Sequence, residues 1–289
     1  MTRFNIQDWV LASRLRTLPA AIAPVLLGWS ICENKHALAA VAALFGAILI
    51  QIATNFANDY FDFINGADTE DRIGPTRATQ AGLIKPHQMK WAFIFTFMLT
   101  LPIIGYLTIR GGMPVVWIGI TSIASGILYT GGPKPLGYMG LGDIFVFVFF
   151  GPIAVAGTDY VQSLTWSTNG ILLGAACGLL STAILVVNNL RDRETDAVVG
   201  KNTLAVRFGE TFVRVEYTLC FVLTLGIIIY FGLQRSWTFI ALLALVPSIP
   251  LQRSMWTESG RALDPNLGKT AKVLVLFSIL FSIGWNIPV

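Results

Sequence analysis

Charge is scarce in this sequence. Only 12% of its 289 residues are Asp, Glu, Lys or Arg, and 54% are hydrophobic, whereas a soluble domain carries about 25% charged residues. The composition excludes an ordinary soluble domain and is typical of a polytopic membrane protein. Because no low-complexity linker divides the chain, we expect one integral-membrane domain over residues 1–289.

Cysteine and histidine are also rare. The three cysteines lie in or beside apolar runs and form no C-x-x-C pair, which favours small buried side chains over a metal or redox motif. The first sixteen residues are polar and basic and lack the short apolar region of a cleavable signal peptide. The basic residues are interleaved with acids in loops, so no nucleic-acid partner is predicted.

Long apolar runs fill most of the chain. About 20 residues are needed to span the hydrocarbon core of a membrane, and most of the runs approach that length. They predict an all-α helical bundle with about nine transmembrane helices. The expected ranges are 17–32, 37–58, 89–109, 113–130, 141–157, 168–189, 212–233, 236–252 and 271–288. The first run is short and contains Pro19 and Pro24, and an amphipathic stretch around Trp9 can extend it toward the N-terminus.

Lysine and arginine are distributed unevenly between the two sides of these helices. With the N-terminus in the cytoplasm, seventeen of them fall on the cytoplasmic side, and only Lys35, Arg110 and Arg235 fall on the other. The positive-inside rule therefore predicts this orientation. It also predicts that the two long loops at about 59–88 and 190–211 face the cytoplasm.

An acidic motif occurs twice, each time at the end of a long apolar run. The two copies comprise Asn58, Asp59, Asp62 and Asp68, and then Asn188, Asp192 and Asp196. In both copies an Asn precedes an Asp by four residues, which places the pair on one face of a helix. The recurrence predicts two parallel, pseudo-repeated four-helix halves followed by an extra ninth helix. Parallel halves bring both motifs to the same membrane face.

The two motifs are predicted to form one magnesium site. Carboxylates at a helix C-terminus face the negative end of the helix dipole, so a cation or basic groups must compensate for them. Mg²⁺ prefers a few carboxylates together with substrate phosphates and water, while the absence of nearby His and Cys disfavours Zn²⁺. The alternative is a set of solvated loop acids paired with arginines. The predicted ligands are Asp59, Asp62, Asp68, Asp192 and Asp196.

Basic residues lie near the acids in sequence. Arg77, Lys201 and Arg207 follow the two motifs, and Lys134 lies between them. Mg²⁺ combined with Lys and Arg neutralises a diphosphate and helps it to leave, although any one of these residues can instead be a positive-inside anchor. The segment 200–203 lacks the earlier glycine and the preceding strand of a nucleotide-binding P-loop.

Two further segments carry candidate residues. The glycine- and proline-rich segment 129–137 is either a tight interhelical turn or a loop in which Lys134 reaches phosphate and Tyr129 faces a developing cation. Arg14 and Arg16 precede the first apolar run. They are either juxtamembrane anchors or the groups that bind an anionic group on an aromatic substrate.

These motifs resemble the UbiA superfamily of membrane prenyltransferases over nearly the whole chain. The resemblance is carried by NDYFD with Asp68, by Asp192-x-x-x-Asp196 and by the nine apolar runs. The stretches RLRTLPAAIAPVLLG, NFANDYFDFINGADTEDRIGPTRA and NNLRDRETDAVVGKNTLAVRFG are most similar to the branch that prenylates 1,4-dihydroxy-2-naphthoate. The usual first motif has an Asp where Gly66 stands here, so whether Asp68 binds metal directly or through water stays open.

The resemblance implies a fold, a location and a reaction. It implies a bundle in the bacterial cytoplasmic membrane, with a central cavity, acids at its cytoplasmic mouth and a side opening to membrane lipid. Mg²⁺ would hold a polyprenyl diphosphate that ionises to an allylic cation. The naphthoate ring would attack this cation and lose CO₂, giving demethylmenaquinol, the reduced form of demethylmenaquinone.

The resemblance also implies roles for individual residues. Asp62 and Asp192 would be catalytic as metal ligands, together with Asp68 and Asp196, and Lys134 and Tyr129 would assist. The supporting residues would be Asn58, Asp59 and Asn188 for the metal, Arg77, Lys134, Lys201 and Arg207 for the diphosphate, and Arg14 and Arg16 for the naphthoate carboxylate.

Three alternatives remain at this stage. A related enzyme with another aromatic acceptor, such as 4-hydroxybenzoate, would keep the same mechanism. A secondary transporter would place ionisable groups near the bilayer midplane, whereas the predicted spans are almost free of charge apart from Asp143. A structural membrane protein would tolerate changes at the acidic motifs.

Overall fold

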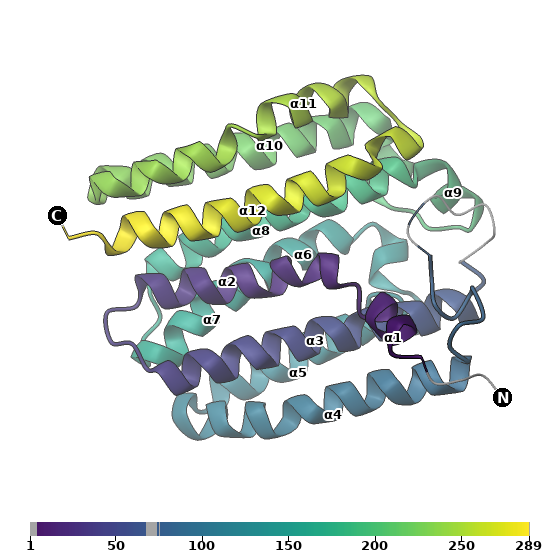
Figure 1. Cartoon of the computed structure of the whole chain (residues 1–289), viewed down its shortest axis with the longest axis horizontal. Coiled ribbons are helices and arrows are strands. Elements are labelled where there is room, and N and C mark those ends of the chain that lie inside the picture. The colour runs from purple at the N-terminus through teal and green to yellow at the C-terminus, as the bar shows by residue number, and fades with distance from the viewer. Residues whose placement is uncertain (1–4, 68–73, 75, 289) are drawn as a thin grey trace.

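The computed structural model describes residues 5–67, 74 and 76–288, and within those residues it contains helices and no strand. Figure 1 shows the long helices running side by side in one bundle. In the first half the elements are α1 (Ile6–Ser13), η1 (Leu15–Thr17), α2 (Leu18–Ile31), α3 (Ala37–Ile64), α4 (Pro86–Gly111) and α5 (Met113–Leu128). They are followed by η2 (Leu136–Met139), α6 (Gly142–Phe150), α7 (Pro152–Ser163), α8 (Thr168–Arg191), α9 (Arg193–Val198), α10 (Leu204–Gln234), η3 (Ser236–Leu245), α11 (Ser248–Thr257), η4 (Gly260–Leu263) and α12 (Asp264–Asn286).

Within the described ranges, eight helical segments are long and apolar enough to cross a membrane, and α5 is a shorter apolar helix. Together they match the nine predicted runs, so the prediction of an all-α, polytopic membrane bundle is confirmed. Large apolar side chains such as Phe95 and Leu233 are exposed on the outside of the bundle. Apolar surface of this extent on the long helices is what a lipid environment requires.

The predicted bounds differ from the observed ones in an informative way. The second run was expected to end at residue 58, but α3 continues to Ile64 and the chain turns at Gly66, whose φ is +68°. Hydropathy changes where polar residues begin, whereas a helix ends where the backbone must leave helical geometry, here at a glycine in the left-handed region. The first motif therefore lies on the last turns of α3.

The two halves of the bundle have corresponding parts. The first span is interrupted in both, at η1 in one half and at Gly151 in the other. The second span, α3 or α8, ends in the acidic motif and packs against the third, α4 or α10. α12 packs against both α2 and α8 and closes the bundle (Figure 1). This correspondence agrees with the predicted repeat of four-helix halves plus one helix.

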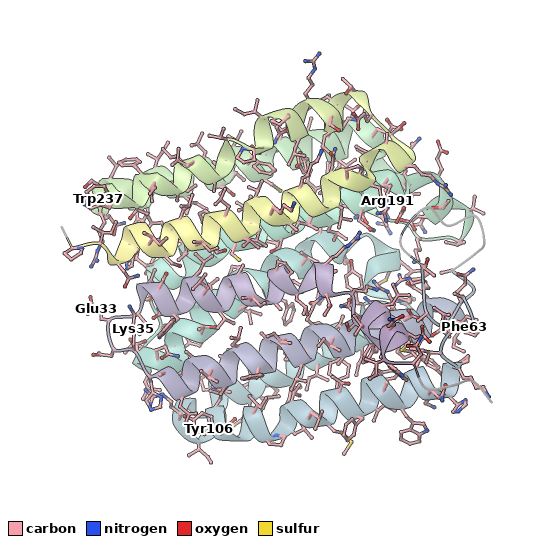
Figure 2. All side chains as sticks on the ribbon, viewed as in Figure 1. Glu33, Lys35, Phe63, Tyr106, Arg191 and Trp237 are labelled. Atoms are coloured by element: carbon pink, nitrogen blue, oxygen red, sulfur yellow. The ribbon has the colours of Figure 1, made fainter. Side chains whose placement is uncertain are left out.

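Both motifs lie at the same end of the bundle. Figure 2 shows Phe63, next to the first motif, and Arg191, within the second, at one end. Glu33, Lys35 and Trp237 lie at the other. Within the described residues three predominantly apolar clusters hold this arrangement. One lies between α8, α10 and α12 around Tyr217 and Phe277, one between α1, α3 and α4, and a smaller one around Leu107 and Val115.

Close packing fixes the broken span of the second half against α8. A Cβ at Gly174 would lie 2.6 Å from the Pro152 Cα, and a Cβ at Gly178 would lie 2.4 Å from the Phe147 carbonyl oxygen. Small residues of this kind let membrane helices approach at backbone distance. The path of α6 and α7 beside α8 therefore depends on these glycines.

We expect Gly174→Ala to destabilise the bundle. The added methyl group meets backbone atoms that cannot rotate away, and overpacking of this kind costs about 1–3 kcal/mol. Thermal unfolding of the purified protein in detergent measures the effect. Gly226→Ala in α10 is the matched control, because a Cβ there meets nothing within 4 Å. Equal melting temperatures for the two variants would contradict the packing argument.

Candidate functional site

A cavity of about 460 Å³ runs through the interior of the bundle between α2, α3, α5, α6, α7 and α8. Its lining on α3 extends from Ala43 to Asp62, which corresponds to about 28 Å of helix at 1.5 Å per residue. One end is lined by charged and amide side chains and most of the remainder by apolar ones. The shape suits a molecule with an anionic head and a long apolar body.

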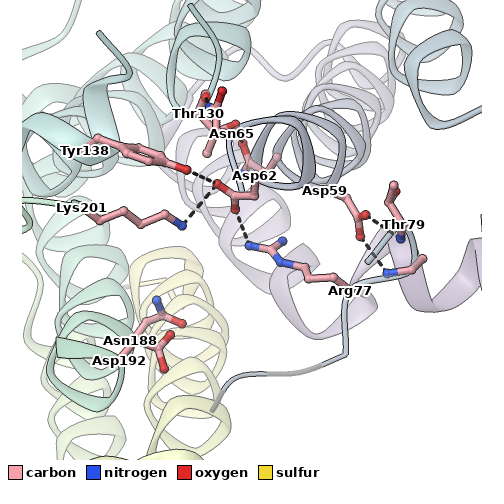
Figure 3. A network of polar contacts seen from close by, with 12 residues as sticks. Asp59, Asp62, Asn65, Arg77, Thr79, Thr130, Tyr138, Asn188, Asp192 and Lys201 are labelled. Atoms are coloured by element: carbon pink, nitrogen blue, oxygen red, sulfur yellow. Dashed lines mark hydrogen bonds and ion pairs between the residues drawn. The ribbon is translucent and has the colours of Figure 1, made fainter. Parts of the chain in front are cut away.

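Both acidic motifs line the polar end of this one cavity. The lining residues from the motifs are Asn58, Asp62, Asn188, Asp192 and Asp196. Figure 3 shows Asp62, Asn188 and Asp192 around the same space. Segments about 130 residues apart in sequence thus meet, as the predicted parallel halves require.

Asp62 is the most heavily contacted acid of the site. It is 1% exposed, and it accepts hydrogen bonds from the Arg77 Nη2 at 2.7 Å and from the Tyr138 Oη at 2.8 Å. The Lys201 Nζ lies 3.2 Å from Oδ1, the same carboxylate oxygen that accepts from Tyr138. The three donors come from three different segments of the chain (Figure 3). In this arrangement two cationic side chains face one buried carboxylate and leave an excess of one positive charge.

Asp59 has a different environment from the one expected of a metal ligand. It is buried, and its carboxylate accepts hydrogen bonds from the backbone N–H groups of Ala78 at 3.1 Å and Thr79 at 2.9 Å. It is not among the residues that line the cavity. Its observed contacts fix the segment that directly follows Arg77, and so position that guanidinium beside Asp62.

The second motif is organised by Arg191. This arginine is 1% exposed in its side chain and donates to both carboxylate oxygens of Asp192, at 2.7 Å each. It also donates to the Asn188 Oδ1 and to Asp264 on α12, both at 2.8 Å. One guanidinium therefore joins the end of α8 to the start of α12. Sequence reasoning missed this residue, since its position next to Asp192 was explained by the positive-inside rule.

Asp192 and Asp196 are four residues apart, so on a continuous helix they would share one face. α8 instead ends at Arg191, and Asp192 joins it to the short helix α9. The Asp196 backbone N–H still donates to the Asp192 carbonyl at 2.8 Å. Both residues line the cavity despite the interruption.

The donor set fits Mg²⁺ only in combination with a substrate. Within the residues that the structure describes, no group of three or more His, Cys, Asp or Glu side chains forms a ready metal cage. Asp62 and Asp192 nevertheless offer hard oxygen atoms to the same cavity, and Mg²⁺ commonly takes its other ligands from phosphate and water. The predicted ligand Asp68 lies outside the described residues.

The predicted basic residues fall into two groups. Arg77 and Lys201 line the cavity, as do Arg14 and Arg16 near the start of the chain. Lys134 and Arg207 are exposed and are not among the lining residues; Arg207 lies beside Gly140. Tyr129, from the same loop as Lys134, does line the cavity.

A polar wall that sequence reasoning missed lies next to Arg14 and Arg16. The Thr17 Oγ1 accepts hydrogen bonds from the Gln51 Nε2 and the Asn55 Nδ2, at 3.0 Å each. These three residues also line the cavity. Gln51 and Asn55 are four residues apart on a mostly apolar stretch of α3, and that spacing was the available signal.

The two lysines of the predicted site are expected to behave differently. Lys201→Gln removes an ammonium group 3.2 Å from Asp62, and losing one preorganised charge-stabilising group costs about 10²–10³ in rate. Lys134→Gln removes an equal charge outside the cavity, and we expect a change of less than about threefold. Steady-state rates of the expected prenyl transfer, measured for both purified variants, test this difference. A larger loss for Lys134→Gln would contradict the observed geometry.

Comparisons with known proteins agree with the fold and with the family resemblance. The model of the UbiA prenyltransferase family matches residues 18–286. The chain is 37% identical to the 1,4-dihydroxy-2-naphthoate octaprenyltransferase of Haemophilus influenzae, over 98% of this chain and 97% of that protein. It is 39% identical to the Escherichia coli protein of the same name, over 96% of this chain and 94% of that protein.

Solved structures share the fold at low sequence identity. A UbiA homolog from Archaeoglobus fulgidus bound to GPP and Mg²⁺ superposes with a TM-score of 0.70 at 14% identity, covering 95% of this chain and 99% of that one. A UbiA homolog from Aeropyrum pernix gives a TM-score of 0.69 at 14% identity, covering 97% and 99%.

Proposed function

This chain belongs to the UbiA prenyltransferase family, and from that premise we propose that it transfers a polyprenyl group from a polyprenyl diphosphate to 1,4-dihydroxy-2-naphthoate in menaquinone biosynthesis. One observation carries the proposal: residues of both acidic motifs lie with Arg77 and Lys201 at the polar end of one long, mostly apolar cavity. The names of the Haemophilus influenzae and Escherichia coli relatives support the choice of acceptor.

The polar end of the cavity is proposed to bind the diphosphate. Asp62, Asp192 and Asp196 would hold Mg²⁺, with Asp68 as a further candidate and with Asn58 and Asn188 as supporting oxygen donors. The bound metal would supply positive charge to the leaving diphosphate. Arg77 and Lys201, at 2.7 Å and 3.2 Å from Asp62, are within reach of an anion held beside that carboxylate. A solved neighbour is bound to GPP and Mg²⁺, which supports a prenyl diphosphate and a divalent metal as the ligands.

The apolar length of the cavity is proposed to hold the prenyl chain. It would keep water away from the allylic cation, which water would otherwise capture. The Tyr129 ring lies in the cavity lining, and an aromatic face attracts a cation.

The polar wall and the N-terminal arginines are proposed to bind the acceptor. Arg14 and Arg16 would pair with the naphthoate carboxylate, while Gln51 and Asn55 would contact the ring hydroxyls. A bond forms between the allylic carbon and the ring carbon that carries the carboxylate. The bond from that ring carbon to the carboxylate then breaks, CO₂ leaves, and the electron pair restores the aromatic ring. No ring proton has to be removed.

The polytopic apolar helices make this an integral membrane protein. We further propose that residues 1–289 form one domain in the bacterial cytoplasmic membrane and that the acidic end of the cavity faces the cytoplasm. The uneven distribution of Lys and Arg supports this orientation.

The decisive assay offers the purified protein a polyprenyl diphosphate, Mg²⁺ and either 1,4-dihydroxy-2-naphthoate or 4-hydroxybenzoate, with products identified by mass spectrometry. We expect prenylated, decarboxylated product from the naphthoate. Prenylation of hydroxybenzoate alone would overturn the acceptor while keeping the mechanism. Ion-driven flux in proteoliposomes without prenyl transfer would favour a transporter.

Removal of the metal is expected to stop turnover reversibly. The protein supplies only part of the coordination sphere of Mg²⁺, so EDTA should remove the metal and abolish product formation. Excess Mg²⁺ should restore product formation. A second readout is thermal unfolding. Mg²⁺ together with a prenyl diphosphate should raise the melting temperature more than either alone. Full activity in EDTA would count against the site.

A further inference from the structure

A second cavity, of about 560 Å³, lies on the outside of the bundle between α11 and α12. It shares no lining residue with the central cavity. Its apolar wall is formed by Pro247, Pro250, Leu251, Val273 and Leu276. The proposed reaction makes no use of this groove.

Two lysines line the groove on one face of α12. Lys269 and Lys272 are three residues apart, so they project on the same side of the helix. Both are exposed, and neither takes part in a salt bridge within the part of the chain that the structure describes.

The depth of Lys272 makes an anionic partner favourable. It lies eight residues after Asp264, the first residue of α12, inside a segment apolar enough to span a membrane. Eight residues correspond to about 12 Å along the helix axis. A charge on the lipid-facing side at this depth is costly, even when the side chain extends toward the headgroups, unless an anion meets it.

The remaining polar groups of the groove leave it net positive. Glu258 is the acid in its lining, and its carboxylate already accepts a hydrogen bond from the Ser254 Oγ at 2.7 Å. The Asn266 Nδ2 donates to the same Ser254 oxygen at 2.6 Å. Two ammonium groups therefore oppose one carboxylate that is held by neighbouring side chains.

We propose that this groove binds one anionic phospholipid of the surrounding membrane. The phosphate lies against Lys269 and Lys272, and an acyl chain follows the apolar wall past Leu251 and Val273. The charge, the apolar wall and the position at the outer surface of two spanning segments match the parts of such a lipid. Basic pockets between membrane helices are known to hold anionic headgroups.

The position of the groove connects the lipid to the central cavity. α12 separates the two cavities, since Leu267 and Ala271 on its other side line the central one. Asp264, at the start of the same helix, accepts the hydrogen bond from Arg191. A lipid bound in the groove therefore stabilises the helix that walls the candidate site.

The test is native mass spectrometry of the 289-residue chain. Phosphatidylglycerol or phosphatidylcholine is added in increasing amounts to the protein in detergent, and the detergent is removed in the gas phase. We expect one phosphatidylglycerol per chain, bound more tightly than phosphatidylcholine. A lysine near an anionic headgroup contributes about fivefold in affinity. Lys272→Gln should therefore weaken binding about fivefold, and Lys269→Gln with Lys272→Gln about 25-fold. Lys90, which is also exposed and lies early in α4, provides the matched control, and Lys90→Gln should leave lipid binding unchanged.

Each alternative occupant gives its own result. Equal affinity for the two lipids, or unchanged phosphatidylglycerol binding in the double variant, overturns the proposal. Competition by soluble glycerophosphate at concentrations near that of the lipid would indicate a free phosphate site instead. A dimer lost only in the double variant would assign the face to a second copy of the chain. Gel filtration checks that every variant is folded, and this check does not depend on the lipid proposal.

Discussion

Asp62→Asn is expected to lower the rate of prenyl transfer by about 10²–10³-fold, and by more if metal binding is lost outright. Asn has nearly the same shape and still accepts a hydrogen bond from Tyr138, but it removes the charge that Arg77 and Lys201 share. Initial rates at saturating substrates measure the effect. Asp192→Asn should behave in the same way, because the same cavity receives both carboxylates.

The control for this prediction is another acid near the second motif. Glu194 is exposed and does not line the cavity, so Glu194→Gln should leave the rate within about twofold of the parent. Melting temperatures in detergent distinguish loss of chemistry from loss of fold. A folded Asp62→Asn protein with normal turnover would remove the basis for the metal site.

The largest loss of stability is expected from Arg191→Met. Breaking a buried ion pair by removing one partner costs about 3–5 kcal/mol, because the other charge stays buried without compensation. Here Asp192, 5% exposed, would be left in that state. Unfolding in detergent measures the loss. Prenyl transfer should also fall, since Asn188 and Asp192 lose the group that orients them.

Two milder variants separate the contributions of Arg191. Arg191→Lys keeps the charge, but its three N–H donors share one nitrogen and cannot reproduce the four hydrogen bonds of the planar guanidinium, so an intermediate loss is expected. Asp264→Asn weakens only the contact to α12, and the Asp264 side chain is 55% exposed, so the cost should stay below about 1 kcal/mol. If Arg191→Met were as stable as Asp264→Asn, the buried pair would have no structural importance.

The overall architecture could be predicted from the sequence because a membrane restricts which secondary structures can cross it. A segment that crosses hydrocarbon must satisfy its own backbone hydrogen bonds and present apolar side chains, which leaves long apolar helices as the solution for such a chain. The recurrence of Asn58-x-x-x-Asp62 as Asn188-x-x-x-Asp192 then predicted that both motifs reach the same end of the bundle. The family was recognised from the same residues, and the comparisons confirmed it.

The contacts of the site were less predictable, because they join segments far apart in the chain. Tyr138 donates to Asp62 across 76 residues and Arg191 to Asp264 across 73, and no spacing rule covers such distances. The loop at 129–137 illustrates the limit. Its composition suggested that Lys134 enters the site, whereas the turn leaves Lys134 exposed and Tyr138, just beyond it, contacts the carboxylate.

The bond between Arg191 and Asp264 also has a consequence for how the protein is made. Ribosomes deliver α3 and α8 to the membrane before α12, the last helix that the structure describes. Until α12 inserts, Arg191 lacks one of its acidic partners, and α2 lacks one of the helices that it packs against. The candidate site should therefore reach its final arrangement late in biogenesis, once α12 has inserted into the bilayer.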